Sequence, residues 1–172
     1  MADPHFIYCP VCATGLIEQP IAHVRRLMCP NCHFIFFLNP ELVVIVVLHH
    51  EDTLLLGKRN IEPAKGLWSF FGGYVERGEK IEEAAIREVK EETNLDVQLE
   101  GLIGLYSERG DSHVLVVYQA SIPNNQTNAL AQQNEEVSDL AFFTWDKLPS
   151  LAFPIDQQIL HDWKKLRDSR RE

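Results

Sequence analysis

Apolar residues are spaced along the chain in short runs that predict strands and in two longer stretches that predict helices. The run LVVIVVL at residues 42–48 is rich in β-branched side chains and suits a strand buried on both faces. Further strand patterns cover residues 53–59, part of 96–106, 113–122 and 139–145, and helical periodicity covers the stretches after Gly73 and 153–167. Because strands and helices alternate, the pattern predicts an α/β or α+β fold around one mixed sheet.

Polar and glycine-rich segments separate these elements. We expect a turn at residues 49–52, a loop at 60–73 with Pro63, Gly66, Gly72 and Gly73 as breakers, and a mobile polar loop at 123–136. The basic and acidic tail at 167–172 is expected to fray. The chain shows no internal repeat.

The first 38 residues have a different pattern, built around two cysteine pairs. The pairs are Cys9-x2-Cys12 and Cys29-x2-Cys32, and a short hairpin pattern lies between them. Each two-residue gap can aim two thiolates at one ion, so four sulfurs would complete a closed structural zinc site, with His33 a bystander. Two disulfides are the alternative, and they suit an exported protein better. We therefore predict a zinc ribbon at residues 1–38 and a larger domain at 39–168.

The composition and net charge of the chain limit the classes of molecule that it is expected to bind. The chain has 172 residues, ordinary apolar content and a net charge of -9. That charge argues against general binding to nucleic acid or to a membrane surface, because both are polyanions. The longest apolar run is too short to span a bilayer, and the N-terminus lacks the features of a secretory signal. A cytoplasmic protein is the expectation.

Residues 72–95, GGYVERGEKIEEAAIREVKEETNL, crowd glutamates onto a helical pattern. On a helix, Glu88 and Glu92 point within about 40° of each other, and Glu91 lies about 60° to the other side of Glu88. Ile81 and Ala84 share that side, so these carboxylates are expected to face inward rather than form a solvated surface. Buried carboxylates are costly to desolvate, and Mg²⁺ or Mn²⁺ would compensate them. The pattern therefore predicts a metal site.

Neighbouring residues support this prediction. Gly72 and Gly73 allow a close backbone approach, so a carbonyl there could join the metal ligands. Glu79 stands near the expected helix start, where the helix dipole favours an anion. Arg87 could pair with Glu79 or with a metal-binding carboxylate and fix its rotamer; a plain surface ion pair is the alternative.

The same stretch resembles the Nudix box, G-x5-E-x7-R-E-U-x-E-E-x-G-U, where U is aliphatic. The matching positions are Gly73, Glu79, Arg87, Glu88, Val89, Glu91, Glu92 and Leu95. Asn94 stands where the family has glycine, and Phe71 stands where relatives often have proline before the double glycine. Asparagine readily adopts the left-handed conformation, so the helix cap is expected to survive. The resemblance implies an α/β/α sandwich.

The resemblance also implies a hydrolase that cleaves a nucleoside diphosphate linked to another group, with two or three divalent ions. By position, Glu88 and Glu92 are the leading ligands, Glu91 is a third ligand or a base, and the Gly73 carbonyl is a backbone ligand. Some relatives take the general base from a loop before a late strand. Here Glu136 is the candidate, with Glu135 behind it, although both could be surface charges.

The substrate is narrowed by the arrangement of the two domains. A zinc ribbon before a Nudix domain resembles NADH pyrophosphatases, but their SQPWPFPxS motif is absent. The chain more closely resembles a compact zinc-ribbon group that includes FAD and ADP-ribose pyrophosphatases. This implies that Arg59, with Lys58, faces the phosphates, and that Trp68, Phe70 or Tyr74 stacks on a base or packs in the core; Tyr106 and His113 stay unassigned.

Other functions stay open. NADH or dinucleoside polyphosphates are alternative substrates, and a non-catalytic nucleotide-sensing module or an RNA cap-removing enzyme are rivals. The complete acidic box and the negative charge disfavour the last two. Many relatives are homodimers, which makes a homodimer an expectation here.

Overall fold

The structure is a computed structural model, and it describes residues 6–123 and 134–169. The chain separates into two compact units, Met1–Pro40 and Glu41–Glu172. Most of the loop expected at residues 123–136 and the end of the tail expected to fray lie outside the described residues. The described part of that tail continues the last helix to Ser169.

The first unit is a small three-stranded sheet with two cysteine knuckles. Strands β1 (Ile17–Ile21) and β2 (Val24–Met28) form the expected antiparallel hairpin, and β3 (Ile35–Phe36) pairs with β2. The residue after each second cysteine, Ala13 or His33, has a positive φ. Its N–H donates to the carbonyl of the first cysteine of the pair, at 2.9 and 3.0 Å. The two knuckles therefore have the same backbone geometry.

The second unit is built on a mixed sheet of seven strands. They are β4 (Glu41–His50), β5 (Thr53–Arg59), β6 (Trp68–Ser69), β7 (Phe71–Tyr74), β8 (Gln98–Tyr106), β9 (His113–Ser121) and β10 (Val137–Thr144). The order is β10-β5-β4-β9-β8, while β6 pairs with β5 and β7 pairs with β4. Only the β4–β9 pairing is parallel among these described strands.

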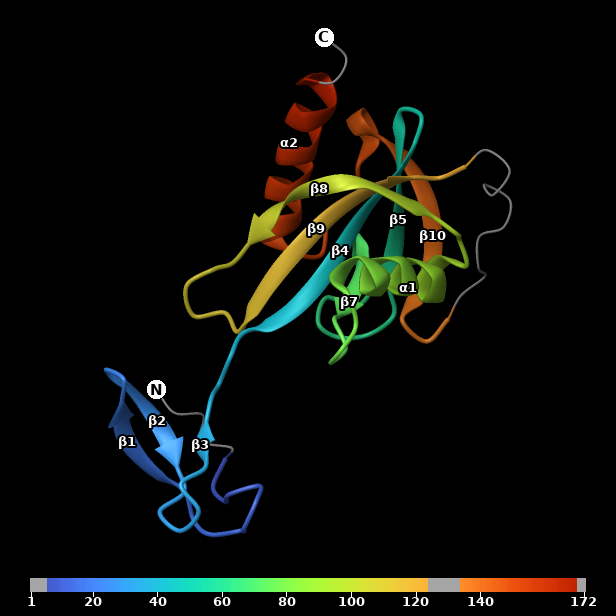
Figure 1. Cartoon of the computed structure of the whole chain (residues 1–172). Coiled ribbons are helices and arrows are strands. Elements are labelled where there is room, and N and C mark those ends of the chain that lie inside the picture. Colours follow the sequence, from blue (N-terminus) through green and yellow to red (C-terminus); the bar gives the residue numbers. More distant parts are fainter. Residues whose placement is uncertain (1–5, 124–133, 170–172) are drawn as a thin grey trace. The chain divides into compact units, whose positions relative to one another are not determined.

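Two helices cover opposite faces of this sheet (Figure 1). Helix α1 (Ile81–Thr93) packs on one face and α2 (Pro154–Ser169) on the other, and a short 3-10 turn, η1 (Trp145–Lys147), precedes α2. Alternate residues of β4 divide between the two cores: Val44, Val46 and Leu48 lie under α1, and Val47 lies under α2. The strand predicted at 42–48 is therefore confirmed, with its buried part at Val44–Leu48 and Leu42 40% exposed, and the architecture is an α/β/α sandwich.

Two sequence expectations are wrong in detail. The segment 60–73 is not all loop, because it contains β6 and most of β7. The expected turn at 49–52 is shorter, because His49 and His50 still belong to β4. In the first case the glycines indicated a loop. Gly72 is nevertheless a strand residue, and a β-carbon there would come within 2.0 Å of the Val44 carbonyl oxygen, which only glycine avoids.

The end of α1 follows the expectation for Asn94. This residue has φ 63° and ψ 11°, the left-handed conformation, and its N–H donates to the Lys90 carbonyl. Asparagine thus closes the helix at the position where the family has glycine. Within the described residues, no helix combines the length and apolarity needed to cross a bilayer.

Candidate metal and active site

The site begins where strand β7 faces helix α1. The Gly72 N–H donates to Glu92 Oε2 at 2.8 Å. A β-carbon at Gly73 would lie 2.6 Å from the Glu88 carboxylate. The double glycine therefore lets two carboxylates of the helix reach the strand backbone, as the sequence predicted.

Arg87 organises the acidic side chains around it. Its Nε donates to Glu79 Oε1 at 2.9 Å and its Nη2 to Glu79 Oε2 at 3.0 Å, which is a two-point ion pair. Its Nη1 donates to Glu88 Oε1 at 2.6 Å, and Nη2 also donates to the Tyr74 carbonyl at 3.1 Å. From the sequence, Glu79 or a metal-binding carboxylate is the expected partner of Arg87, and in the structure Arg87 contacts both Glu79 and Glu88.

These contacts shift the pKa values of the partners. Hydrogen bonding to Glu79 is the main cause that raises the pKa of Arg87 above its ordinary value. Hydrogen bonding from Arg87 lowers the pKa of Glu79, so both groups stay charged. Arg87 is thus a fixed cation that holds the rotamer of Glu88.

Glu91 does not share the inward position of its neighbours, which corrects the sequence prediction. Its side chain is 60% exposed, whereas that of Glu88 is 11% exposed. Glu91 Oε2 is 3.3 Å from Arg87 Nη1. Around the helix axis, Glu91 and Glu92 lie on opposite sides of Glu88. Glu91 is therefore at the edge of the buried face, where its side chain reaches solvent. It borders the site rather than lining its floor.

Burial and mutual repulsion raise the pKa values of the two inward carboxylates. Desolvation raises the pKa of Glu92 to about 8, and the negative charges of Glu88 and Glu136 act in the same direction. The Gly72 N–H and Arg59 oppose the shift. Desolvation also raises the pKa of Glu88, against the effect of Arg87. These carboxylates therefore need a proton or a cation for compensation near neutral pH.

Asn134 ties the segment that carries Glu136 to the end of α1. Its Nδ2 donates to the carbonyls of Glu91 and Glu92, at 3.2 Å each. Its Oδ1 accepts the N–H groups of Glu136 and Val137 at 2.9 and 2.6 Å. Glu136 is exposed, and its charge acts on both Glu88 and Glu92. The structure therefore brings Glu136 to the acidic cluster, which is formed by Glu88, Glu91 and Glu92. Sequence reasoning missed Asn134, because nothing local marks an asparagine that caps a distant helix.

The cluster fits divalent cations by the chemistry of its donors. Carboxylate and carbonyl oxygens are the ligands that Mg²⁺ and Mn²⁺ prefer, and burial raises the pKa values of Glu88 and Glu92, so a bound cation would favour their charged forms. The carboxylates of Glu88, Glu91 and Glu92 do not converge as one closed set of ligands. Within the described residues, only the four cysteines bring three or more His, Cys, Asp or Glu ligand atoms within 4.8 Å of one another.

The candidate substrate residues lie in different surroundings. Arg59 donates from Nε to the Pro63 carbonyl at 2.8 Å, and its guanidinium lies 5.1 Å from the centre of the Phe153 ring. Its charge lowers the pKa values of both Glu92 and Asp156. Arg59 therefore lies between the acidic cluster and the start of α2.

Asp156 is a buried carboxylate that the sequence did not single out. It is 4% exposed, and its Oδ2 accepts the Phe153 N–H at 3.0 Å. Desolvation raises its pKa to about 6. From the sequence, an aspartate in the first turn of a predicted helix indicates a helix cap. Only the tertiary structure shows that Asp156 is buried near Arg59.

The aromatic candidates divide between core and surface. The Trp68 ring packs edge-on against Phe143 at 4.8 Å, and Phe70 is buried in the same apolar cluster under α2. Tyr106 is buried as well, with its hydroxyl donating to Asp162. Tyr74 is 53% exposed and its hydroxyl lies 3.1 Å from His113 Nε2. Of the three candidates Trp68, Phe70 and Tyr74, only Tyr74 has an exposed ring.

The four cysteines of the first unit are free thiols rather than disulfides. Their sulfur atoms lie within 4.8 Å of one another, and the Cys9–Cys32, Cys12–Cys29 and Cys12–Cys32 pairs are 3.6, 3.4 and 3.5 Å apart. Four thiolates around one zinc ion at 2.3 Å would be about 3.8 Å apart. The backbone N–H groups of Val11 and Cys32 approach Cys9 and Cys29 sulfurs at 3.4 Å each. The cluster fits zinc, and His33 is not part of it.

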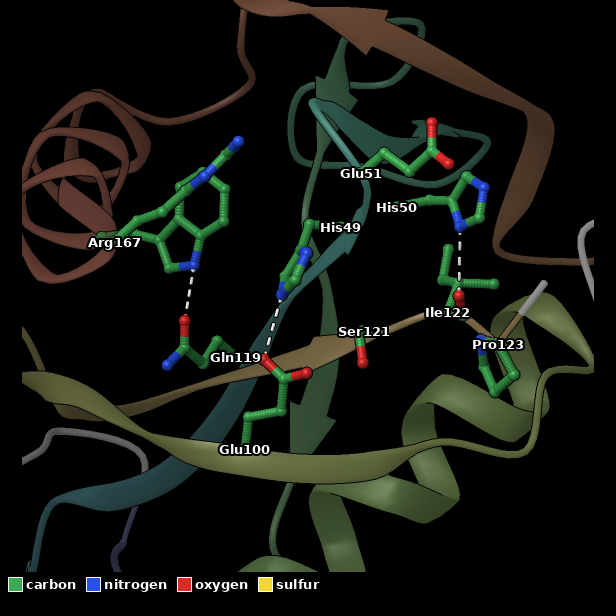
Figure 2. Close-up of a pocket in the computed structure, with 10 residues that line it drawn as sticks. His49, His50, Glu51, Glu100, Gln119, Ser121, Ile122, Pro123 and Arg167 are labelled. Atoms are coloured by element: carbon green, nitrogen blue, oxygen red, sulfur yellow. Dashed lines mark hydrogen bonds and ion pairs between the residues drawn. The ribbon is translucent and has the colours of Figure 1, made fainter. Parts of the chain in front are cut away.

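The second unit also has a cavity of about 580 Å³, and Figure 2 shows residues that line it. It is formed by the ends of β4 and β9 together with β8 and α2, and its walls include the His49–Glu100 pair, whose atoms are 3.0 Å apart. The Trp163 indole N–H donates to Gln119 Oε1 at 2.8 Å at the same place. No residue of the acidic box lines this cavity.

Comparisons with known proteins agree with this geometry. The model of the NUDIX domain matches residues 39–163. The ADP-ribose pyrophosphatase of Methanocaldococcus jannaschii is 33% identical over 138 residues, which are 77% of this chain and 78% of that protein. The crystal structure of a NUDIX hydrolase from Nitrosomonas europaea superposes with a TM-score of 0.79 at 27% identity, covering 90% of this chain and 88% of that one.

A second group of relatives is longer than this chain. The NAD-capped RNA hydrolase NudC of Pseudomonas aeruginosa is 29% identical over 149 residues. The match covers 86% of this chain but only 51% of that protein, so the chain spans about half the length of these relatives.

Proposed function

Because the chain belongs to the NUDIX family, we propose that it is a divalent-metal-dependent pyrophosphatase that hydrolyses a nucleoside diphosphate linked to another group. ADP-ribose or FAD is the proposed substrate, and AMP is a product. The observation that carries this proposal is the approach of two inward carboxylates, Glu88 and Glu92, to the backbone of Gly72 and Gly73.

Glu88, Glu92 and the Gly73 carbonyl are the proposed ligands of Mg²⁺ or Mn²⁺, with Glu91 available from the rim. Divalent ions at such a site supply charge stabilisation to the phosphate oxygens and lower the pKa of water. Arg87 holds Glu88 in place through its two-point anchor on Glu79. Arg87 contacts Glu88 Oε1, which leaves Glu88 Oε2 available to bind the metal ion.

Hydrolysis requires water oxygen to bond to phosphorus, the bridging P–O bond to break, and a water proton to reach a base. Glu136 is the proposed base, because Asn134 fixes its backbone beside Glu92 and its side chain stays exposed.

Arg59 is proposed to face the substrate phosphates, because its charge reaches Glu92. Tyr74 is proposed to contact the distal part of the substrate through its exposed ring, and the Phe153 ring offers an apolar surface beside Arg59. Trp68 is the weaker candidate for stacking, since packing against Phe143 already accounts for its position. The name of the archaeal relative, ADP-ribose pyrophosphatase, supports the choice of substrate.

The test is a hydrolysis screen with Mg²⁺ and Mn²⁺ on ADP-ribose, FAD, NADH and diadenosine polyphosphates, with product identification. We expect AMP from ADP-ribose or FAD, loss of turnover in Glu92→Gln, and a fall in kcat of about 100-fold or more in Glu136→Gln. Glu83→Gln is the matched control, since Glu83 is 61% exposed and pairs only with Lys80 among the described residues. Failure of every compound would refute the enzymatic proposal, and tight ADP-ribose binding without turnover would indicate a sensor.

A second candidate substrate is NADH or an NAD-capped RNA end. The observation in its favour is the match to NudC, because 149 aligned residues exceed the length of the second unit and so extend into the four-cysteine unit. The two candidates are separated by comparing kcat/KM for ADP-ribose, NADH and an NAD-capped oligonucleotide. A preference of tenfold or more for the capped RNA would favour this second function.

For the first unit, we propose one structural zinc ion held by Cys9, Cys12, Cys29 and Cys32. Four sulfurs leave no ligand position open, so this ion would stabilise the fold rather than act on substrate.

A further inference from the structure

A chain of polar contacts lies beside the acidic site and is not explained by it. His113 Nδ1 is 2.6 Å from Asp111 Oδ1, and the His113 backbone N–H donates to the same oxygen at 3.0 Å. His113 Nε2 is 3.1 Å from the Tyr74 hydroxyl, and Glu41 Oε2 lies 3.6 Å from that nitrogen. Asp111 thus fixes the imidazole, and the imidazole fixes the phenol.

These side chains lie on the face of the sheet opposite to α1. Residues 115 and 117 of β9 pack under α2, so His113 points to the same face by the alternation of a strand. A β-carbon at Gly73 would face Glu88 under α1, so the next residue, Tyr74, points the other way. The contact chain therefore holds β7 from the face that the acidic helix does not touch.

The backbone of Tyr74 connects this chain to the acidic site. Its carbonyl accepts Arg87 Nη2 at 3.1 Å, and Gly73 is its immediate neighbour. Strand β7 has only four residues and pairs with β4 alone among the described strands. The ladder with β4 and the Gly72–Glu92 hydrogen bond hold β7 in the sheet and on the α1 side, and the Tyr74 hydroxyl adds a contact on the opposite face.

We propose that Asp111 and His113 are positioning residues for the cation site. Through the Tyr74 hydroxyl they hold β7 at a fixed position, and so hold the Gly73 carbonyl and the Arg87 anchor against Glu88. This inference rests on the proposed metal-dependent function. It assigns no contact with substrate to Asp111 or His113.

The experiment measures Mn²⁺ binding to the full chain by electron paramagnetic resonance, without substrate, and kcat and KM with Mg²⁺ and ADP-ribose. The variants are His113→Ala, Asp111→Ala and Tyr74→Phe. The matched control is His49→Ala, because His49 also pairs with a carboxylate, Glu100, at 3.0 Å, but does so at the cavity remote from the box. Thermal unfolding verifies that each variant is folded.

We expect a roughly tenfold weaker Mn²⁺ affinity in His113→Ala, since residues that orient metal ligands typically have effects of about 10- to 100-fold. The kcat should fall by a similar factor with KM within about twofold of the wild-type value. Tyr74→Phe should weaken Mn²⁺ binding and lower kcat by similar factors. The double variant His113→Ala/Tyr74→Phe should lose no more Mn²⁺ affinity than either single variant, because the two residues act in series. His49→Ala should keep wild-type Mn²⁺ binding.

Unchanged Mn²⁺ affinity and kcat in folded His113→Ala would overturn the inference, as would equal losses in His49→Ala. A rise in KM in His113→Ala, with unchanged Mn²⁺ affinity and kcat, would also overturn it, because that result would show an effect on substrate binding and none on the cation site. If the wild-type chain binds Mn²⁺ but cleaves no diphosphate compound, the proposed function fails while the Mn²⁺ measurements still decide this inference.

Discussion

The Glu88 carboxylate lies so close to Gly73 that a β-carbon at residue 73 would come within 2.6 Å of it. This contact joins strand β7 to helix α1 at the point where both Arg87 and the acidic cluster meet. A side chain at residue 73 can be accommodated only if the Glu88 carboxylate moves.

Gly73→Ala is therefore expected to lower kcat by at least about tenfold, because it displaces a proposed metal ligand. The loss of stability should be small, since the displaced group is the flexible end of a side chain. Steady-state kinetics and thermal unfolding measure the two effects. Gly15→Ala, which has no atom within 4 Å of the new methyl group, should change neither. Full activity of Gly73→Ala would contradict the close approach.

The response to Mg²⁺ should depend on pH through Glu92. Its pKa in the folded chain is about 8, above the value of an exposed glutamate, so the folded state binds the proton more tightly. Without divalent ions, Glu92 therefore makes stability decrease as pH rises from about 4 to 8. A cation competes with that proton, so Mg²⁺ should raise Tm more at pH 8.5 than at pH 5.5.

In Glu92→Gln, stability without divalent ions should change less with pH. Most of the Mg²⁺-induced rise in Tm should also be lost. Differential scanning calorimetry at the two pH values checks both results. An equal Mg²⁺ shift in the variant would show that the ion binds elsewhere.

Asp156 should limit stability above its own pKa. Burial raises that pKa to about 6, so the folded state favours the protonated form and the penalty grows as pH rises from about 4 to 6. Asp156→Asn keeps an acceptor for the Phe153 N–H but carries no charge. We expect it to gain up to about 3 kcal/mol over the wild type between pH 4 and 7.

Urea unfolding of Asp156→Asn and of the wild type at pH 4 and at pH 7 measures this gain in the free energy of unfolding. A variant whose advantage does not grow with pH would contradict the buried, charged state of Asp156.

Asn94→Gly should stabilise the end of α1. The residue has φ 63°, which glycine adopts without steric cost, and its side chain is exposed. The expected gain is no more than about 1 kcal/mol, because glycine also has more freedom in the unfolded chain. Urea unfolding measures it, and Lys90→Gly within the same helix should instead lose about 1 kcal/mol.

Cys29→Ser should remove zinc from the first unit. Cys29 is fully buried within the sulfur cluster, and three sulfurs hold the ion less well. We expect about one zinc per wild-type chain and much less in the variant by atomic absorption, with faster proteolysis between residues 17 and 28. The second unit has its own two cores and should retain its fold. Equal zinc content in both proteins would exclude the cysteine site.

The sequence by itself determined the elements whose signals are local. The β-branched run of β4, the acidic helix, the left-handed cap at Asn94 and the cysteine spacing each depend on residues within a few positions of one another. Helical periodicity also placed Glu88 and Glu92 on the buried side, and the pairing of Arg87 with Glu79 follows from their spacing and charge. These features need no knowledge of distant contacts.

Only the tertiary structure decided what depends on contacts between distant segments. Gly72 and Gly73 belong to a strand because they pair with Ile45 and Val44 of β4. The packing of α1 leaves the Glu91 side chain 60% exposed, whereas it buries Glu88. Asn134 reaches the carbonyls of Glu91 and Glu92 across more than 40 residues, and His113 finds Tyr74 across β4. Such contacts arise from packing, and packing energies depend on neighbours that spacing along the chain does not identify.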